Sequence, residues 1–425
     1  MFVIAGIQTV TDRFKKLDRQ LAESLVCNFA NKGLISFGKK IAKNFPKDYI
    51  GSFYKQYNTI KEYSCIEKYI DSGGYQIATQ QIPKKYIDKY TDTYVKFLET
   101  NDFDYAFSLD IPDNNEYKDV SELVNLNRKA MDKIVASNVD KNKILFVVHF
   151  RTINLFEIWK NLLDYLDHFH NVAIGGLVVA QSNMKNLPFI FSITGIMMIL
   201  HELKQKNILK TKFHVLGNST FKDVVLYTLL QKAVKDFYNI DFILTYDSSN
   251  LFKKFQQARF MTYWDQEREE AYQVSAKENE LNLRRYNGRS SKDILLEEVY
   301  TMAKTINYDG KFDRIYNDEG KFDDKISPFL LLIESYQQIK FEKWMEKKVD
   351  YYYNLYKDNP NEFVIELQKL LFSIGSKNKK LAGIIKNTLD MLKMDFDIKT
   401  IEGLLKSYSI VTDSEFLDQP AQFSI

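Results

Sequence analysis

The sequence predicts a (β/α)8 barrel, a TIM barrel, followed by an all-α C-terminal appendage. Eight short apolar runs occur within residues 1–260, and near-continuous hydrophobicity over such lengths is typical of strands buried on both faces. Segments with helical spacing separate most of these runs, and eight strands alternating with helices is the number that a barrel needs. A doubly wound open sheet is the alternative, because residues 33–37 fit a strand or a helix.

The predicted strands share an apolar stretch that ends in polar or small residues. They are Phe2–Ile7, Gly33–Phe37, Lys68–Gly74, Asp104–Ile111, Lys143–Phe150, Asn171–Val179, Lys212–Asn218 and Asp241–Ser249. Helical patterns between them cover Tyr117–Asn138, Asn154–Phe169 and Ser219–Phe237. The last pattern opens with two candidate caps, Ser219 and Thr220, and places Asp223 in its first turn.

The pattern changes after Phe260, where no further strand is predicted. Helical spacing continues in Ser327–Lys357, Glu362–Gly375 and Lys380–Lys393. We therefore expect two domains, a barrel over residues 1–260 and a helical region over residues 261–425. No low-complexity linker separates them, so the helical region is expected to pack against the barrel.

The charge balance does not demand a nucleic-acid partner, because 59 Lys and Arg face 56 Asp and Glu. Three local clusters are nevertheless basic: Gly38–Lys47, Asn282–Arg289 and Ser376–Asn387. Each reads most simply as a solvated helix face. The basic helices after Phe260 are also candidates for phosphate contacts.

The cysteine count and the apolar segments limit compartment and partners. Two cysteines, Cys27 and Cys65, exclude a framework of several disulfides and a zinc site of several thiolates, and they fit a reducing cytoplasm. The N-terminus lacks the features of a signal peptide. The longest apolar segment, Leu187–Leu200, is too short to span a bilayer and reads as a buried helix. We expect a cytoplasmic protein with no membrane partner.

Polar residues and glycines end most of the predicted strands. In a (β/α)8 barrel the active site lies at the carboxyl ends of the strands, so these residues should meet at one mouth. They are Asp71, Asp110, His149, Gly175, Gly176, Gly217 and Asp247. Each aspartate alone could cap a helix, but three carboxylates converging on one cavity indicate chemistry. Adjacent glycines let a flat ligand or a backbone approach closely.

The segment DSGGYQ, Asp71–Gln76, resembles the signature of the tRNA-guanine transglycosylases, which are (β/α)8 barrels. The likeness continues in order through four further motifs. They are FSLD (Phe107–Asp110), GGL (Gly175–Leu177), HVLG (His214–Gly217) and LTYDSS (Leu244–Ser249). It covers roughly residues 1–260 and leaves the C-terminal region unmatched.

The resemblance implies a role for each matching residue. Asp247 would be the nucleophile at C1′ of the nucleotide, and Asp71 the general acid/base for the leaving and incoming bases. A carboxylate can trap an oxocarbenium-like centre covalently, and a second carboxylate can move the protons. Tyr75 would stack on the base. The remaining substrate-binding residues would be Ser72, Gly73, Gly74, Gln76, Asp110, His149, Gly175, Gly176, Leu177 and Gly217. No cofactor is implied.

The sequence differs from the family at two points, and both bear on which nucleic acid is the substrate. The tRNA enzymes hold zinc with three cysteines and a histidine after the nucleophile, whereas no Cys or His follows Asp247 here, so we expect no metal. His149 stands where family members often carry Gln. Both departures favour the DNA-acting branch, which places 7-deazaguanines such as 7-cyano-7-deazaguanine (preQ0) into phage or bacterial DNA. A target base in a duplex would have to be flipped out.

The first hypothesis is therefore a DNA-guanine transglycosylase, with DNA and a free 7-deazaguanine as partners, acting in a host cytoplasm if a phage encodes it. A zinc-less tRNA-guanine transglycosylase is the second. A non-catalytic nucleic-acid-binding subunit is the third, although such subunits typically lose the catalytic aspartates. An unrelated barrel hydrolase with a chance likeness is the fourth.

Overall fold

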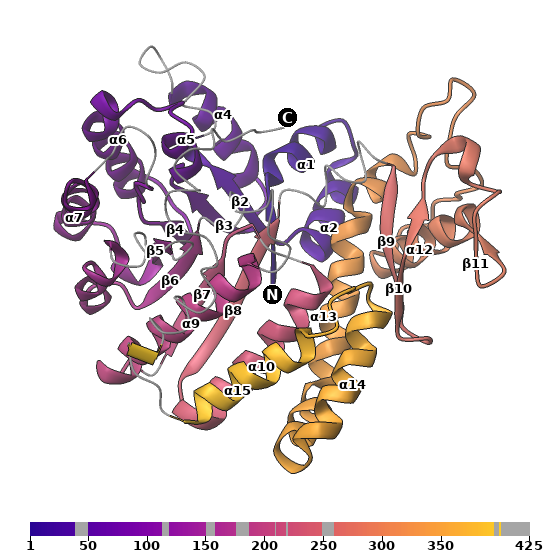
Figure 1. Ribbon diagram of the computed structural model, residues 1–425. Coiled ribbons are helices and arrows are strands. Elements are labelled where there is room, and N and C mark those ends of the chain that lie inside the picture. Colours follow the sequence, from indigo (N-terminus) through magenta and orange to yellow (C-terminus); the bar gives the residue numbers. More distant parts are fainter. Residues whose placement is uncertain are drawn as a thin grey trace.

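Eight parallel strands close into a barrel in the computed structural model, and their order around the barrel follows the sequence (Figure 1). They are β1 (Phe2–Ala5), β2 (Lys32–Ser36), β3 (Glu67–Asp71), β4 (Tyr105–Phe107), β5 (Ile144–His149), β6 (Asn171–Gly175), β7 (Lys210–Val215) and β8 (Asp241–Ser248). β8 closes the barrel by pairing with β1, where Asp247 lies opposite Val3. Each strand overlaps a predicted run, so the barrel is confirmed and the open sheet is excluded.

The structure describes residues 1–38, 50–112, 119–149, 158–175, 187–208, 210–217, 220–248, 259–394 and 399–400. Two predicted site residues, Gly176 and Leu177, lie outside these ranges.

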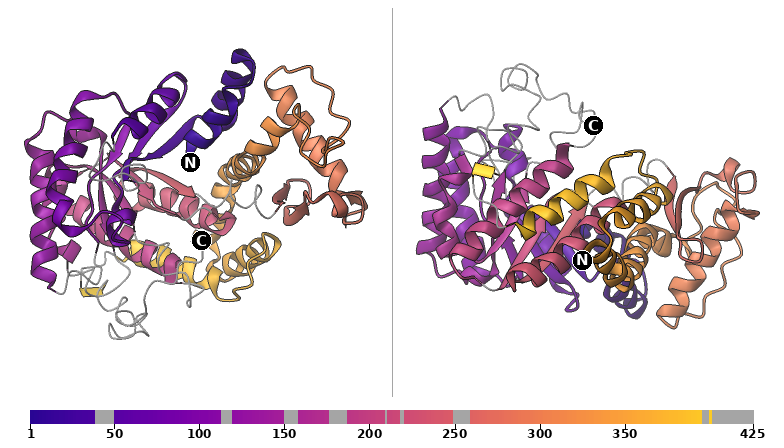
Figure 2. Two further views of the ribbon diagram at one scale, coloured as in Figure 1. Left: turned by 90° about the horizontal axis from the view of Figure 1, so that it is seen from above. Right: turned by 60° about the horizontal axis from the view of Figure 1, so that its bottom comes forward.

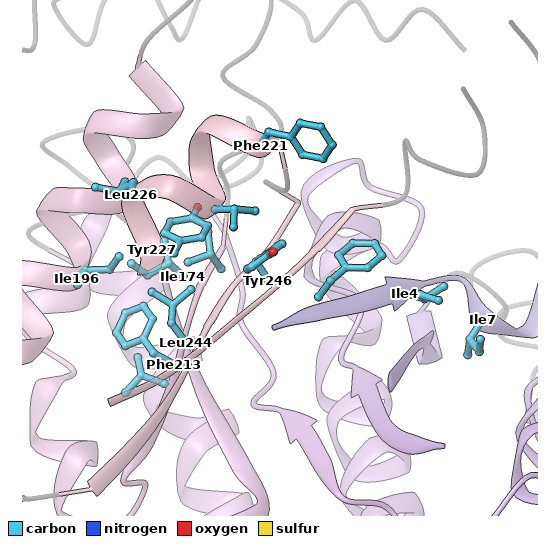
Figure 3. Packing of buried hydrophobic residues seen from close by; sticks show 14 of the residues in the cluster. Ile4, Ile7, Ile174, Ile196, Phe213, Phe221, Leu226, Tyr227, Leu244 and Tyr246 are labelled. Carbon is cyan, nitrogen blue, oxygen red and sulfur yellow. The ribbon is translucent and has the colours of Figure 1, made fainter. Parts of the chain in front are cut away.

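Both faces of the barrel strands are buried, which explains their unbroken hydrophobicity. One face points inward, where a small cluster fills the barrel with side chains from six of the strands. Its buried members are Val3, Leu34, Tyr69, Phe107, Leu145, Val147 and Ala173. The other face packs on the surrounding helices, so that Phe213, Leu244 and Tyr246 lie beside Leu226 and Tyr227 of α10 (Figure 3).

The helices between the strands are α1 (Ile7–Phe14), α2 (Arg19–Phe29), α4 (Ile50–Lys61), α5 (Gly74–Ala78), α6 (Ile87–Thr100), α7 (Val120–Ala136), α9 (Leu187–Gln205) and α10 (Phe221–Tyr238). α10 begins with a capping box of Thr220 and Asp223, as the sequence predicts. In the predicted helix at 154–169, by contrast, the described part contains a 3-10 helix, Leu163–Asp167. None of the helices in the described ranges is both long and apolar enough to cross a bilayer.

The C-terminal region is mainly helical, with α12 (Ser291–Thr305), α13 (Ser327–Asp358), α14 (Pro360–Ser373) and α15 (Leu381–Lys393). It is not entirely helical, however. It also contains two antiparallel hairpins, β9 (Phe260–Asp265) with β10 (Glu270–Ser275), and β11 (Arg285–Tyr286) with β12 (Arg289–Ser290). Two side chains of α13 accept hydrogen bonds from backbone amides on the unpaired edge of β9. Glu334 accepts from the Thr262 amide and Gln337 from the Trp264 amide, both at 3.0 Å.

Helix α13 packs on the barrel itself, between the helices that follow β7 and β1 (Figures 1 and 2). Its Phe341 ring stacks on Phe221 of α10 at 4.3 Å, and its Glu342 bonds the hydroxyl of Tyr246 on β8. The eighth helix position of the barrel is thus filled by residues 327–358, beyond the predicted boundary at residue 260. The C-terminal region packs against the barrel, as expected.

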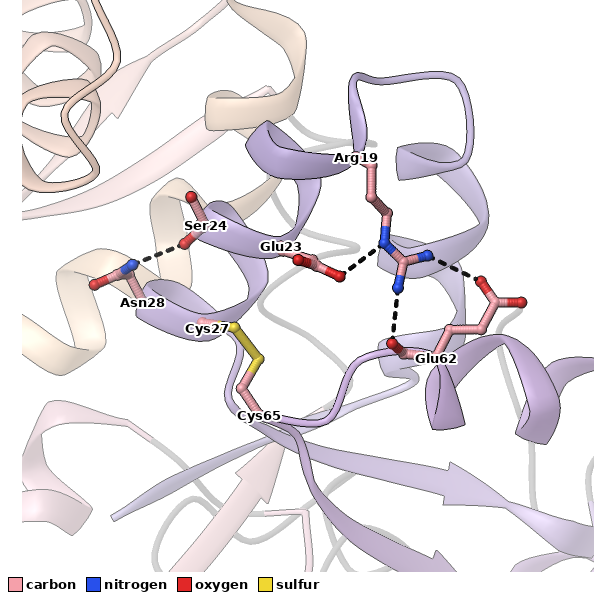
Figure 4. Close-up of a disulfide and its surroundings, with 7 residues drawn as sticks. All are labelled: Arg19, Glu23, Ser24, Cys27, Asn28, Glu62 and Cys65. Atoms are coloured by element: carbon pink, nitrogen blue, oxygen red, sulfur yellow. Dashed lines mark hydrogen bonds and ion pairs between the residues drawn. A yellow bond between two sulfur atoms is a disulfide. The ribbon is translucent and has the colours of Figure 1, made fainter.

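A disulfide joins Cys27 of α2 to Cys65, which lies just before β3 (Figure 4). Both sulfurs lie near the amino-terminal ends of β2 and β3, and Arg19 ties the same two segments by pairing with Glu23 and Glu62. This one disulfide is not the framework of several bonds that the cysteine count excludes. The sequence could not show it, since the two cysteines are 38 residues apart and meet only in the fold.

Candidate active site

Three carboxylates meet at the carboxyl end of the barrel, where the sequence places them. Asp71 ends β3, Asp247 lies near the end of β8, and Asp110 follows β4. Their charges interact, since Asp110 and Asp247 both raise the pKa of Asp71. A (β/α)8 barrel with acidic groups at this end is typical of enzymes.

Asp71 has the most perturbed carboxyl group of the three. Burial, with smaller contributions from Asp110 and Asp247, raises its pKa to about 6, even though the Ser36 side chain and the Gly73 amide bond the ionised form. The Gly73 amide lies 3.1 Å from Oδ1. A carboxyl group with such a pKa can both give and take a proton near neutral pH, which suits a general acid/base.

Asp247 is buried, and its hydrogen bonds to described residues are made through one oxygen, Oδ1. Its Oδ1 accepts from the Gly217 amide at 2.8 Å and lies 3.2 Å from Nε2 of His214. His214 is fully buried, and burial lowers its pKa below the usual value. Gly217 has φ +80°, a backbone conformation that favours glycine and aims its N–H at the carboxylate.

Asp110 is buried and is bonded through both of its oxygens. Nε2 of His149 lies 2.6 Å from Oδ2, and the Ser72 hydroxyl donates to Oδ1 at 3.0 Å. The His149 ring stacks on Trp159 with centroids 5.6 Å apart. His149 therefore contacts Asp110 directly, and one of its two ring nitrogens is already hydrogen-bonded.

The two glycines of the DSGGYQ segment allow close approaches within the protein. A Cβ on Gly74 would lie 2.2 Å from Oδ2 of Asp110, so glycine is required for that carboxylate to sit there. Gly73 has φ +94°, and a Cβ on it would lie 2.6 Å from the backbone of Gly38. Gly175 of β6 leaves room for His149 in the same way, with a Cβ position 2.9 Å from Cε1 of the ring.

The two residues that follow these glycines differ in exposure. Tyr75, at the start of α5, is 45% exposed, so its ring is accessible from solvent. Gln76 is buried, and its Oε1 has no hydrogen-bond partner among the described residues. A buried acceptor without a donor is costly. Gln76 therefore has spare hydrogen-bonding capacity, with its Oε1 close to Gly38.

The sequence analysis assigned no role to four residues that support the site: Ser36, Trp159, His214 and Thr245. Thr245 and Asp247 share the inward face of β8, because side chains alternate along a strand. His214 pairs with Thr245 in register on the neighbouring strand β7. Alternation was the available signal, but the register between β7 and β8 is not visible in the sequence.

A second charged cluster lies at the opposite, amino-terminal end of the barrel. Burial alone would raise the pKa of Glu67, but hydrogen bonds from Lys212, Lys32 and Tyr69 lower it to about 2. A cavity of about 460 Å³ opens beside Glu67 and Lys212. In a (β/α)8 barrel the active site lies at the carboxyl ends of the strands, so polar groups at the amino-terminal end typically stabilise the fold.

Within the described ranges, no group of three or more His, Cys, Asp or Glu side chains is placed to hold a metal ion.

No protein-family model matches the chain, and none of the curated proteins matches it significantly. The case for its function therefore comes from the barrel and its carboxylates.

Proposed function

We propose that the protein is a DNA-guanine transglycosylase, a pentosyltransferase that exchanges guanine in DNA for a 7-deazaguanine such as preQ0. One observation carries the proposal. Two carboxylates at one barrel mouth have contrasting environments, since Asp71 has a raised pKa and Asp247 is held by an amide and a histidine. Base exchange at a sugar needs this combination of a proton carrier and an ionised nucleophile.

The first half of the reaction breaks the bond between guanine and the sugar. Oδ2 of Asp247 attacks C1′, and the pair of electrons of the C1′–N9 bond leaves with guanine. Asp71, protonated at the start, gives its proton to the departing base. A covalent aspartyl-glycosyl intermediate results, and the phosphodiester backbone stays intact.

The second half reverses these steps with the new base. Asp71, now ionised, takes the N9 proton of the incoming 7-deazaguanine, whose nitrogen attacks C1′ and releases Asp247. Two inversions restore the original configuration at C1′. A pKa of about 6 lets one carboxyl group serve both halves near neutral pH.

Asp110 is suited to read the base. An ionised carboxylate has about four acceptor positions, so it can bond Ser72 and His149 and still accept from N1–H and the 2-amino group of a guanine-like base. Tyr75 offers an exposed ring for stacking at the same mouth. A base that carries neither donor would leave Asp110 without these bonds.

Two features favour DNA over tRNA. The chain has no Cys or His after Asp247, so it lacks the zinc-holding residues of the tRNA enzymes that it resembles. Residues 376–393 carry five lysines and one aspartate, a balance that suits phosphate contacts. An enzyme of this kind would act where DNA is exposed, in the cytoplasm of a bacterium or of a phage host.

Incorporation of labelled guanine tests the proposal. The protein is incubated with the labelled base and either duplex DNA or tRNA, with Asp247→Asn as the matched control. We expect label in DNA with the wild-type protein and none with the variant. Label in tRNA alone would establish the zinc-less tRNA enzyme instead. Label in neither polymer would contradict base exchange and favour a binding subunit or a hydrolase.

A further inference from the structure

We infer that His214 and Thr245 are positioning residues for Asp247, which hold one of its oxygens and direct the other into the mouth. This inference rests on the proposed function, in which Asp247 is the nucleophile. It concerns a hydrogen-bonded chain inside the barrel, Thr245–His214–Asp247, in which the family resemblance assigns no role to His214 or Thr245.

The chain is built on two neighbouring strands. His214 of β7 and Thr245 of β8 are partners in register, and Nδ1 of the imidazole lies 2.9 Å from the Thr245 hydroxyl oxygen. Nε2, on the opposite side of the ring, lies 3.2 Å from Oδ1 of Asp247. The strand pairing itself thus places the imidazole between the hydroxyl and the carboxylate.

The surroundings keep the imidazole neutral. His214 is fully buried, with the rings of Phe107 and Tyr69 at centroid distances of 5.0 and 5.7 Å. This burial disfavours the imidazolium and outweighs the attraction of Asp247, and Lys212 on the same strand adds to the effect. A neutral ring has one N–H and one acceptor nitrogen.

The hydrogen bonds then fix the tautomer. An ionised carboxylate can only accept, so Nε2 must carry the proton that bonds Asp247. Nδ1 is left as the acceptor, and the Thr245 hydroxyl donates to it. The other acceptors within reach of that hydroxyl are the Phe213 carbonyl, more distant at 3.2 Å, and the Tyr69 hydroxyl. Thr245 therefore holds His214 in the Nε2–H form.

As a consequence, the two carboxylate oxygens of Asp247 have different hydrogen-bond environments. Oδ1 of Asp247 receives the Gly217 amide and the His214 N–H, whereas no described residue donates to Oδ2. Because the ring is neutral, it donates without neutralising the carboxylate, as an imidazolium would. Oδ2 remains available for C1′.

The tautomer is measured directly by nitrogen NMR on the whole protein labelled at its five histidines, with His214→Gln to assign the signals. We expect a neutral ring protonated at Nε2 at pH 7, because burial lowers the pKa of His214. In Thr245→Val, which loses the hydroxyl at nearly constant shape, we expect a mixture of tautomers. A wild-type ring protonated at Nδ1, or an imidazolium, would overturn the inference. This result does not depend on activity, so it stands apart from failure of the proposed function.

The rate of covalent adduct formation on guanine-containing DNA supplies the second readout. In His214→Phe the rate should fall roughly 10²-fold with little change in KM, and the acid limb of the pH profile should move up by about one unit. In His214→Gln, which can keep a donor to Asp247, the rate should recover to within about tenfold of the wild type. Unchanged rate and pH profile in His214→Phe would overturn the positioning role.

Discussion

His149 and Asp110 form one hydrogen-bonded unit at the barrel mouth, with Nε2 of the imidazole 2.6 Å from Oδ2 of the carboxylate. Trp159 holds one face of the ring, and Gly175 leaves room for its edge. A donor to Oδ2 fixes the direction in which Asp110 presents its remaining acceptor positions. His149 thereby acts on a bound base through Asp110, at a position where the resembling enzymes often carry Gln.

His149→Gln should therefore alter base preference more than stability. A glutamine amide can donate to Asp110, but its different reach shifts the carboxylate, and one lost or misaligned bond changes affinity by about tenfold. The measurement compares kcat/KM for guanine and preQ0, with His149→Phe as the variant that keeps stacking on Trp159 but loses the donor. An equal loss for every base would indicate that His149 only fills space.

Asp71→Asn should abolish exchange and yet stabilise the fold at alkaline pH. The pKa of Asp71 is raised in the folded state, so ionisation costs stability as the pH rises from about 3.8 toward about 6 and beyond. The neutral amide avoids this cost, and we expect a gain of about 3 kcal/mol at pH 8 that largely disappears near pH 4. Urea unfolding of both proteins at the two pH values measures it. A variant less stable than the wild type at pH 8 would contradict the raised pKa.

Glu67→Gln should destabilise the opposite end of the barrel without touching the mouth. The change leaves Lys32 and Lys212 without their carboxylate. Because these pairs are partly buried, the loss should lie between the roughly 1 kcal/mol of a surface pair and the about 3–5 kcal/mol of a buried one. Because the pKa of Glu67 is lowered to about 2, the wild-type contribution is present at neutral pH and is lost as the pH falls from about 4.5 toward that value.

Urea unfolding at pH 7 and at pH 3 checks the effect of Glu67→Gln. The matched control is Glu122→Gln, which removes the exposed partner of Lys84 and should cost less than about 1 kcal/mol. Equal effects of the two substitutions would show that the inner cluster is no stronger than a surface pair.

Charge reversal of Lys377, Lys379 and Lys380 to Glu should weaken DNA binding. These lysines are exposed between α14 and α15, and each phosphate contact contributes about 0.9 to the slope of log K against log salt. The slope should therefore decrease by about 3. The same reversal at three exposed lysines of α4 and α6, Lys55, Lys61 and Lys96, is the control. Equal affinity and slope in the test variant and the wild type would assign the lysines to a solvated face.

The barrel was predictable because each of its strands is a short apolar run, and burial on both faces is a local property of the sequence. The hairpin β9–β10 was not predictable, because the open edge of β9 is satisfied by Glu334 and Gln337, which lie more than 70 residues later. The disulfide and the place of α13 in the barrel likewise depend on contacts between distant segments.

The candidate site likewise has residues that the sequence predicts and partners that it does not. Asp71, Asp110 and Asp247 were predictable as a group, since strand ends of a barrel share one mouth. Their partners were not, because the contacts of Asp110 with His149 and of Asp247 with His214 each join residues more than 30 apart in the chain. Those partners decide which oxygen of each carboxylate is already hydrogen-bonded.

Trapping the covalent intermediate tests the nucleophile most directly. The protein is incubated with guanine-containing DNA, run on a denaturing gel and digested for mass spectrometry, for the wild type, Asp71→Asn and Asp247→Asn. We expect a DNA adduct on the peptide that carries Asp247 in the wild type, a weaker one in Asp71→Asn, and none in Asp247→Asn, whose DNA binding is retained. An adduct that persists in Asp247→Asn would contradict the proposed mechanism and move the nucleophile to Asp71 or Asp110.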